Sequence, residues 1–282
     1  MFFMKNLFPA VIFICACCAN AADIDIWKGV KMPSPQNSKI VENAFTKKDE
    51  RYKSIGKPFM RYFEAQNASG KPSAAVLILG GGGYTQIALE RDAIPAAKLL
   101  AENGIASFVL AYRLPDNHDG ALMDAQRAVR LIRKNAKKLN IDPEKIGVMG
   151  FSAGGHLAAR LSNEGEDFYK NTDAADGMSK NVAFTILIYP AYLAGKNSLE
   201  LSPEIKVSKG SPRAFIMQTQ DDAAYEASSV GYMLALRAAG VPVDFHYFKK
   251  GGHGYALRVH GIPAAAWSNL LVSWLKFNNI GR

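Results

Sequence analysis

Short apolar segments alternate with longer amphipathic ones along most of this chain. The apolar segments predict strands at 75–79, 105–112, 146–149, 184–189, 214–218 and 243–248. The amphipathic segments predict helices at 94–102, 121–139, from 154 onward, at 228–239 and near 264–277. Strands that alternate with helices in this way imply right-handed crossovers. They predict the α/β class, with a mostly parallel central sheet and helices on both faces.

The pattern predicts one catalytic domain over residues 58–282, because no repeat, low-complexity tract or linker divides it. Residues 22–57 are polar, contain Pro33, Pro35 and Gly56, and show no sustained period, so they predict an extended N-terminal segment. The one long irregular stretch inside the domain runs from Pro190 to Pro212. It is too short for a separate lid domain and is expected to form a wall of the site.

Residues 1–21 have the three parts of a signal peptide. Lys5 precedes an uncharged apolar run from Leu7 to Ala19, and small residues surround a cleavage point after Ala21. A secreted or periplasmic protein is therefore predicted, with no stable membrane insertion after cleavage. A buried N-terminal helix and a lipid anchor on Cys17 or Cys18 are the alternatives.

The composition of the chain argues against several kinds of function. Hydrophobic residues make up 49% of the chain and charged residues 21%, which is typical of a folded domain with a large core. All three cysteines lie inside the predicted signal peptide, so the mature chain would have no disulfide and no thiolate nucleophile. The formal net charge is +9, but the lysines are scattered among acids without interleaved aromatic residues. A solvated surface is predicted, and nucleic acid is not a predicted partner.

The segment from Gly150 to Gly155 fits the G-x-S-x-G pattern of a nucleophile elbow, with Ser152 as the nucleophile. The pattern alone is weak, but a predicted strand ends just before it and a predicted helix begins just after it. An elbow needs this context, because the serine must stand on a sharp turn where glycines permit close backbone approach. A glycine-rich turn without catalysis is the alternative.

A serine hydroxyl needs a base, and His253 is the candidate. Of the five histidines, it is the one in a glycine-rich loop, directly after the last predicted strand. His156 lies one helical turn beyond Ser152 and is expected to be a packing residue. The acid that orients the base should fall between serine and histidine in chain order. Asp222 is the choice, and its neighbour Asp221 is expected to hydrogen-bond and stabilise the loop.

Four glycines, Gly80 to Gly83, follow the strand predicted at 75–79. They lack the Lys-Ser/Thr of a phosphate-binding loop and do not complete the dinucleotide pattern. They instead predict an oxyanion hole, in which Ala153 and either Gly82 or Gly83 donate backbone N–H groups. Tyr84 is expected to line the acyl or sugar pocket. This chemistry requires no metal and no organic cofactor.

Six segments carry a resemblance to a known family: GGGGY, AYRLP, DAQRAVRLIR, IGVMGFSAGGHLAA, QTQDD and KGGHGYALR. Over roughly 74–274 the chain resembles the acetylxylan and feruloyl esterase-like α/β hydrolases, which are related to the hormone-sensitive-lipase-like esterases. The resemblance implies the α/β-hydrolase fold and a Ser152, Asp222 and His253 triad. It also implies removal of acetyl or feruloyl groups from decorated plant polysaccharide such as xylan.

The substrate is thus expected to be an acylated carbohydrate, held near Tyr84, Tyr225 and Tyr255 in an open pocket suited to short acyl groups. Two other functions remain open. A prolyl-oligopeptidase-like peptidase shares the elbow motif but normally carries a large N-terminal domain. A catalytically inactive carbohydrate-binding homologue would have lost a triad member, whereas all three are present here.

Overall fold

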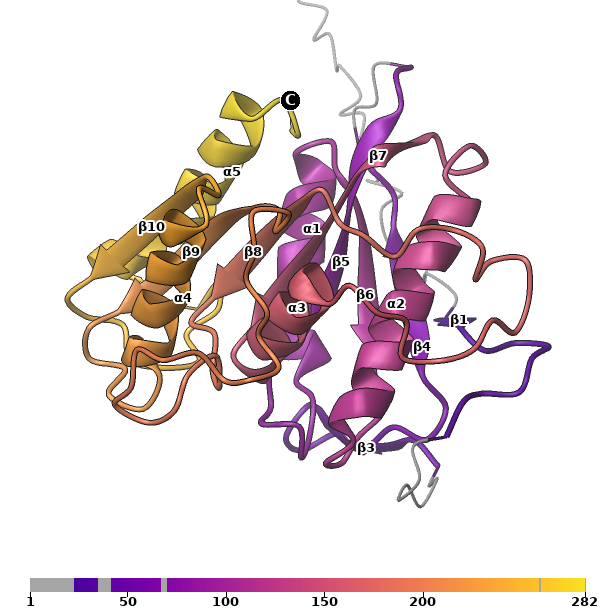
Figure 1. Cartoon of the computed structure of the whole chain (residues 1–282), viewed down its shortest axis with the longest axis horizontal. Coiled ribbons are helices and arrows are strands. Elements are labelled where there is room, and N and C mark those ends of the chain that lie inside the picture. Colours follow the sequence, from indigo (N-terminus) through magenta and orange to yellow (C-terminus); the bar gives the residue numbers. More distant parts are fainter. Residues whose placement is uncertain (1–22, 35–41, 67–69, 259, 282) are drawn as a thin grey trace, which may run out of the picture.

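The computed structural model describes residues 23–34, 42–66, 70–258 and 260–281. Its centre is an eight-stranded sheet in the order β1-β4-β6-β5-β7-β8-β9-β10 (Figure 1). The strands are β1 Asp23–Asp25, β4 Phe59–Phe63, β5 Ser73–Leu79, β6 Ala106–Ala111, β7 Ile141–Phe151, β8 Phe184–Ile188, β9 Arg213–Thr219 and β10 Val243–Phe248. From β6 to β10 every pairing is parallel, and β4 runs antiparallel to both of its neighbours.

The helices that follow the strands are α1 Ile94–Glu102, α2 His118–Lys134, α3 Ala153–Asn163, α4 Glu226–Ala238 and α5 Trp267–Phe277. In Figure 1, α2, α3 and α4 lie in front of the sheet. Right-handed crossovers put α1 on the opposite face, because β6 and β8 lie on opposite sides of the β5 and β7 pair. Among the described helices, none has both the length and the apolar character needed to cross a bilayer.

The central strands are mostly apolar because both faces of the sheet are covered. Every residue of β5, β6 and β8 is buried. On one face, Trp274 of α5 packs its ring against Phe184 and Phe215. The predicted α/β fold with a mostly parallel sheet is confirmed.

The N-terminal segment differs from its prediction. β1 is an edge strand of the main sheet, and β2 (Ala44–Thr46) and β3 (Arg51–Ser54) form a separate two-stranded sheet. Trp27 is only 5% exposed, and its indole N–H donates to Asp124 of α2 at 2.8 Å. Described residues before 58 are therefore part of the catalytic domain. Strands of three or four residues are too short to give a recognisable sequence period. The predicted signal peptide, residues 1–21, lies outside the described residues.

The bounds of two predicted elements also differ in the structure. Helix α2 begins at His118, three residues before the predicted start, because the Asn117 side chain caps it by accepting the N–H of Gly120 at 3.0 Å. It ends at Lys134, where prediction extended it to 139. Strand β7 is longer than the predicted 146–149, running from Ile141 to Phe151. Its last residue delivers the chain directly to Ser152.

Candidate active site

The carboxyl end of β7 and the start of α3 meet at Ser152, which has the strained backbone angles φ 52° and ψ −120°. A side chain on Gly150 would place its Cβ 2.1 Å from the carbonyl oxygen of Gly154, and one on Gly154 would reach within 2.2 Å of the Leu79 carbonyl. The N–H of Ser152 donates to Ile188, and its carbonyl accepts from Ala191. The turn is sharp because glycines allow this approach, and it fixes the serine at the carboxyl end of the central strands.

Three side chains from distant parts of the chain form a hydrogen-bonded series. Ser152 Oγ lies 2.7 Å from His253 Nε2, and His253 Nδ1 lies 2.7 Å from Asp222 Oδ2. The Asp222 side chain is 1% exposed and the His253 side chain 31%. Asp222 follows β9 and His253 follows β10, so parallel neighbours bring both to the same edge as Ser152.

The neighbouring acid, Asp221, faces a different way. Its carboxylate accepts the backbone N–H of Gly251 at 3.0 Å and that of Gly252 at 2.8 Å. These N–H groups, that of Gly252 most strongly, lower the pKa of Asp221 because they favour its charged form. Asp221 thus holds the turn that carries His253, while Asp222 contacts the imidazole itself.

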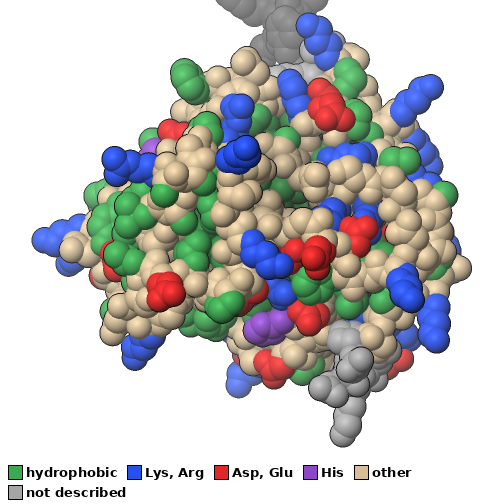
Figure 2. All heavy atoms as spheres, viewed as in Figure 1, with side chains coloured by type: hydrophobic (Ala, Val, Ile, Leu, Met, Phe, Trp, Pro, Cys, Tyr) green, Lys and Arg blue, Asp and Glu red, His purple; other side chains and the backbone are tan. Residues whose placement is uncertain are grey.

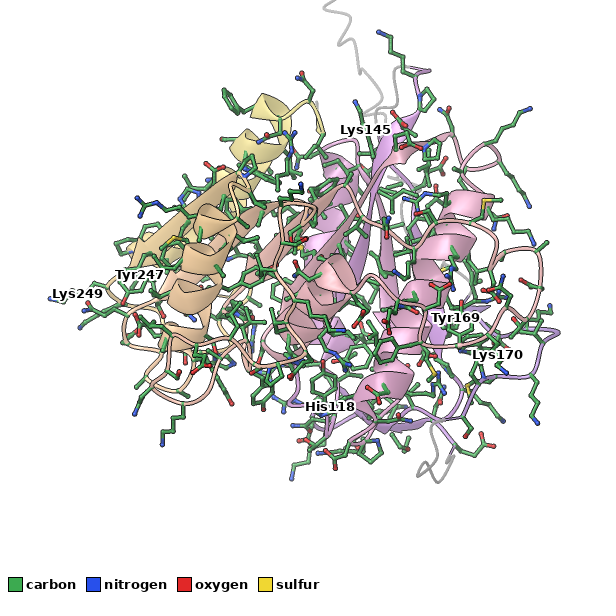
Figure 3. All side chains as sticks on the ribbon, in the orientation of Figure 1. His118, Lys145, Tyr169, Lys170, Tyr247 and Lys249 are labelled. Carbon is green, nitrogen blue, oxygen red and sulfur yellow. The ribbon has the colours of Figure 1, made fainter. Side chains whose placement is uncertain are left out.

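His156 lies in the interior beneath the site. Its Nδ1 is 2.8 Å from the hydroxyl of Tyr84, and its Nε2 is 3.1 Å from Oε1 of Glu204. Burial lowers its pKa to about 4, so the imidazole is neutral near pH 7. His118, at the start of α2 (Figure 3), stacks on Tyr84 with ring centroids 4.0 Å apart. Both histidines therefore pack around Tyr84.

Backbone N–H groups suited to an oxyanion gather beside Ser152. Gly82 and Gly83 line the same cavity as the serine and have φ of 143° and 66°. At Gly82 a Cβ would lie 2.0 Å from the Gln86 carbonyl, so this conformation requires glycine. Ala153 is the first residue of α3, where helical N–H groups have no partner within the helix. Within the described ranges, the N–H groups of Gly82, Gly83 and Ala153 have no assigned acceptor.

The cavity over Ser152 has a volume of about 280 Å³. Tyr225 lines it, but Tyr84 and Tyr255 do not. Tyr84 is fully buried with its hydroxyl on His156, and Tyr255 is 5% exposed and packs on the ring of Tyr189. The expectation that Tyr84 and Tyr255 contact substrate is therefore wrong, because both side chains point into the core.

Several residues of this cavity were not predicted from the sequence. The aromatic ones are Tyr189 and Tyr192, and the charged ones are Arg51, Arg91, Asp92 and Arg258. Tyr192 was detectable, because it follows β8 just as Asp222 follows β9, and functional side chains gather at the carboxyl ends of parallel strands. The charged set had no such signal, since its members come from three separate segments.

Asp92 is 7% exposed and lies next to the glycine loop. Burial raises its pKa to about 6, although three arginines and the N–H of Gly81 favour the charged form.

Throughout the described part of the chain, no three His, Cys, Asp or Glu side chains are grouped as ligands of a metal ion would be.

The chain is similar to known α/β hydrolases in both sequence and structure. The BD-FAE family model matches residues 62–191. The chain is 31% identical to an acetylxylan esterase of Xylanibacter ruminicola over 71% of its own length and 44% of that protein. It spans about two fifths of the length of the curated relatives it matches first.

Two solved structures extend the comparison over most of both chains. One is an acetyl ester-xyloside bifunctional hydrolase from Caldicellulosiruptor lactoaceticus, with 28% identity, a TM-score of 0.74, and coverage of 93% of this chain and 97% of that one. The other is MGS-M1, an α/β hydrolase from a Medee basin deep-sea metagenome library, with 31% identity, a TM-score of 0.64, and coverage of 78% and 92%. The chain belongs to the α/β-hydrolase family.

Proposed function

We propose that this protein is an exported serine esterase that removes short acyl groups from plant polysaccharide such as xylan. The observation that carries the proposal is the hydrogen-bonded series from Asp222 through His253 to Ser152, with both distances at 2.7 Å. Acetyl is the expected acyl group and feruloyl the alternative. No observation in the structure favours a peptidase or an inactive binding protein.

In the first half of the proposed cycle, Ser152 Oγ attacks the ester carbonyl while His253 Nε2 takes its proton. The N–H groups of Ala153 and the glycine loop stabilise the oxyanion that forms. His253 then gives the proton to the departing sugar oxygen, and an acyl-enzyme remains. Asp222 accepts the Nδ1 hydrogen throughout, which fixes the imidazole tautomer and stabilises its charged form.

In the second half, His253 takes a proton from water as that water attacks the acyl carbonyl. The tetrahedral intermediate collapses, the C–O bond to Ser152 breaks, and the proton returns to the serine oxygen. One ester and one water thus give one alcohol and one carboxylic acid. Every proton transfer uses the same imidazole nitrogen.

The shape of the cavity supports a short acyl group on a bulky alcohol. Its volume of about 280 Å³ is at the low end for ligand sites, which run from about 300 to 1,000 Å³. Tyr192 is 37% exposed at its rim, and its ring lies 5.3 Å from that of Tyr225. Exposed aromatic faces of this kind suit sugar rings. Relatives named acetylxylan esterase and acetyl ester-xyloside hydrolase support the same substrate class.

The test is release of acetate and ferulate from natural xylans by the purified protein, alongside a series of 4-nitrophenyl esters of increasing chain length. Acetate release without cleavage of the xylan backbone is expected, and kcat/KM should fall sharply by about eight carbons because the cavity is small. Ser152→Ala is the matched control for both assays. A preference for long acyl chains, or faster cleavage of prolyl peptides than of acetyl esters, would contradict the proposal.

Export is a separate part of the proposal and rests on residues 1–21, which the structure does not describe. Expression of the full chain in a bacterial host should give a mature protein outside the cytoplasm that begins at Ala22. N-terminal sequencing of the exported protein checks this. An intact N-terminus in the cytoplasm would contradict export without affecting the esterase proposal.

A further inference from the structure

A second cavity adjoins the one over Ser152. It has a volume of about 690 Å³, and its lining includes five cationic side chains: Lys47, Lys48, Arg51, Lys53 and Arg91. Arg51 and Arg91 also line the cavity over the serine, so the two cavities are neighbours that share these arginines. We call this second cavity the basic groove. It lies along β3 and the turn before it, which belong to the predicted extended N-terminal segment, and Gln86 and Arg91 complete its lining.

The protein neutralises only part of the positive charge of this region. In the parts of the chain that the structure describes, no ion pair involves Arg51, Arg91 or Arg258, and Nε of Arg51 is buried without an acceptor. The Arg258 guanidinium donates to the carbonyl oxygen of Gly254. Three carboxylates accompany six cations across the two cavities: Asp49 pairs with Lys53 at 3.8 Å, Glu50 lines the groove, and Asp92 lies almost fully buried in the wall.

Some arginines elsewhere in the molecule do pair with carboxylates. Arg127 pairs with Asp173 at 2.7 Å and Asp176 at 2.9 Å, and Arg113 pairs with Asp124 at 2.9 Å. On the face shown in Figure 2, Lys and Arg side chains are interspersed with carboxylates. An excess of cations beside a nucleophile raises the local concentration of anions, and arginine binds carboxylates through paired N–H groups. The arrangement therefore favours a ligand that brings its own negative charge.

We propose that the basic groove binds carboxylate groups of an acidic polysaccharide, so that the preferred ester stands on a sugar chain that also carries uronic acid. The inference rests on the proposed esterase function and names its substrate class. Because Arg51 and Arg91 line both cavities, the carboxylate and the ester are parts of one molecule that spans them. Among the described residues that line the groove, none is aromatic, whereas single-stranded nucleic acid needs aromatic faces on which bases stack.

The experiment compares kcat/KM for matched acetylated oligosaccharides. One pair is a xylo-oligosaccharide with a uronic acid side group and the same compound with its carboxyl reduced to an alcohol. A second pair is an acetylated oligogalacturonide and its carboxyl-reduced form, which separates a side-group carboxylate from a main-chain one. For at least one pair the charged form should be preferred about tenfold at low salt. Salt at about 0.5 M should remove most of that preference because it screens exposed charges.

Arg91→Gln and Arg51→Gln should each lower the ratio of charged to reduced substrate at least about threefold, and the double variant should bring it close to one. Lys276→Gln is the matched control, since this exposed lysine of α5 lines neither cavity, and it should keep the wild-type ratio. Lys48→Gln, at the surface of the groove, provides a second variant if an arginine variant fails to fold.

The outcomes separate the two proposals. Hydrolysis of neutral acetyl esters with a ratio of one for both pairs would overturn the acidic-substrate inference and leave the esterase function intact. A ratio above one that the groove variants do not change would also overturn it. Failure of the wild-type protein to hydrolyse any acetyl ester would instead contradict the proposed function.

Discussion

Replacing Asp222 by asparagine tests how the buried acid acts on the imidazole. Asp222 makes one 2.7 Å hydrogen bond to His253 Nδ1 and its side chain is 1% exposed, so water cannot replace it. An asparagine that presents its NH2 group would force Nδ1 to accept, and Nε2 would then carry the hydrogen. Nε2 could no longer take the proton of Ser152. We expect kcat to fall on the order of 10⁴-fold, about 5.5 kcal/mol in the barrier.

Asp221→Asn is the matched control, because it makes the same chemical change one residue away. Asp221 accepts the N–H groups of Gly251 and Gly252, and an amide oxygen can still accept a hydrogen bond. The pKa of Asp221 is lowered by these contacts, so the substitution also removes a charge that the turn stabilises. We expect kcat to fall by about tenfold or less.

The assay is hydrolysis of 4-nitrophenyl acetate from pH 5 to 9, with circular dichroism to confirm that both variants fold. The pH range distinguishes a wrong tautomer of His253 from a changed pKa of His253. A changed pKa would let activity return at another pH, whereas a wrong tautomer would not. Equal losses in the two variants, or a larger loss for Asp221→Asn, would refute the assignment of the orienting acid to Asp222.

Two further predictions concern the fold around the site. Gly154→Ala should lower the free energy of unfolding by more than about 3 kcal/mol, because the new Cβ would lie 2.2 Å from the Leu79 carbonyl. Gly165→Ala is the control, since its Cβ would have nothing within 4 Å, and it should change the free energy of unfolding by less than about 1 kcal/mol. Equal denaturant midpoints for the two variants would contradict this prediction. The pKa of Asp92 is raised from 3.8 to about 6, so the folded state binds a proton at this carboxyl more tightly than the unfolded state does. The stability that this proton contributes is lost as pH rises from about 4 to about 6. The stability of Asp92→Asn relative to the wild type should therefore rise by about 2 kcal/mol from pH 4 to pH 7, and a difference independent of pH would argue against a buried, ionising carboxyl.

The sheet and the elbow were predictable because their causes are local. Parallel strands covered on both faces are mostly apolar, as β5 and β8 are, and such runs stand out in a sequence. The elbow is similar, since Gly150 and Gly154 are needed by backbone contacts close to Ser152. The chain order of serine, acid and base was also predictable, because it follows from the α/β-hydrolase architecture once the elbow is recognised.

The remaining features depend on contacts that a sequence pattern does not contain. Tyr84 follows the glycine loop, yet its side chain turns into the core because His156 binds its hydroxyl at 2.8 Å. The short antiparallel strands β1 and β4 pair with each other across more than thirty intervening residues, so no local period predicts them. Arg51, Arg91 and Arg258 meet at one cavity from three segments, which only the fold brings together.

The most direct test of the central claim is the site of covalent labelling by a fluorophosphonate, which reacts with a serine hydroxyl that a neighbouring base has activated. The account predicts one adduct, on Ser152 as located by peptide mass spectrometry. The adduct should be absent from Ser152→Ala and formed far more slowly in His253→Ala. An adduct on another residue, or undiminished esterase activity in Ser152→Ala, would contradict the claim that Ser152 is the nucleophile.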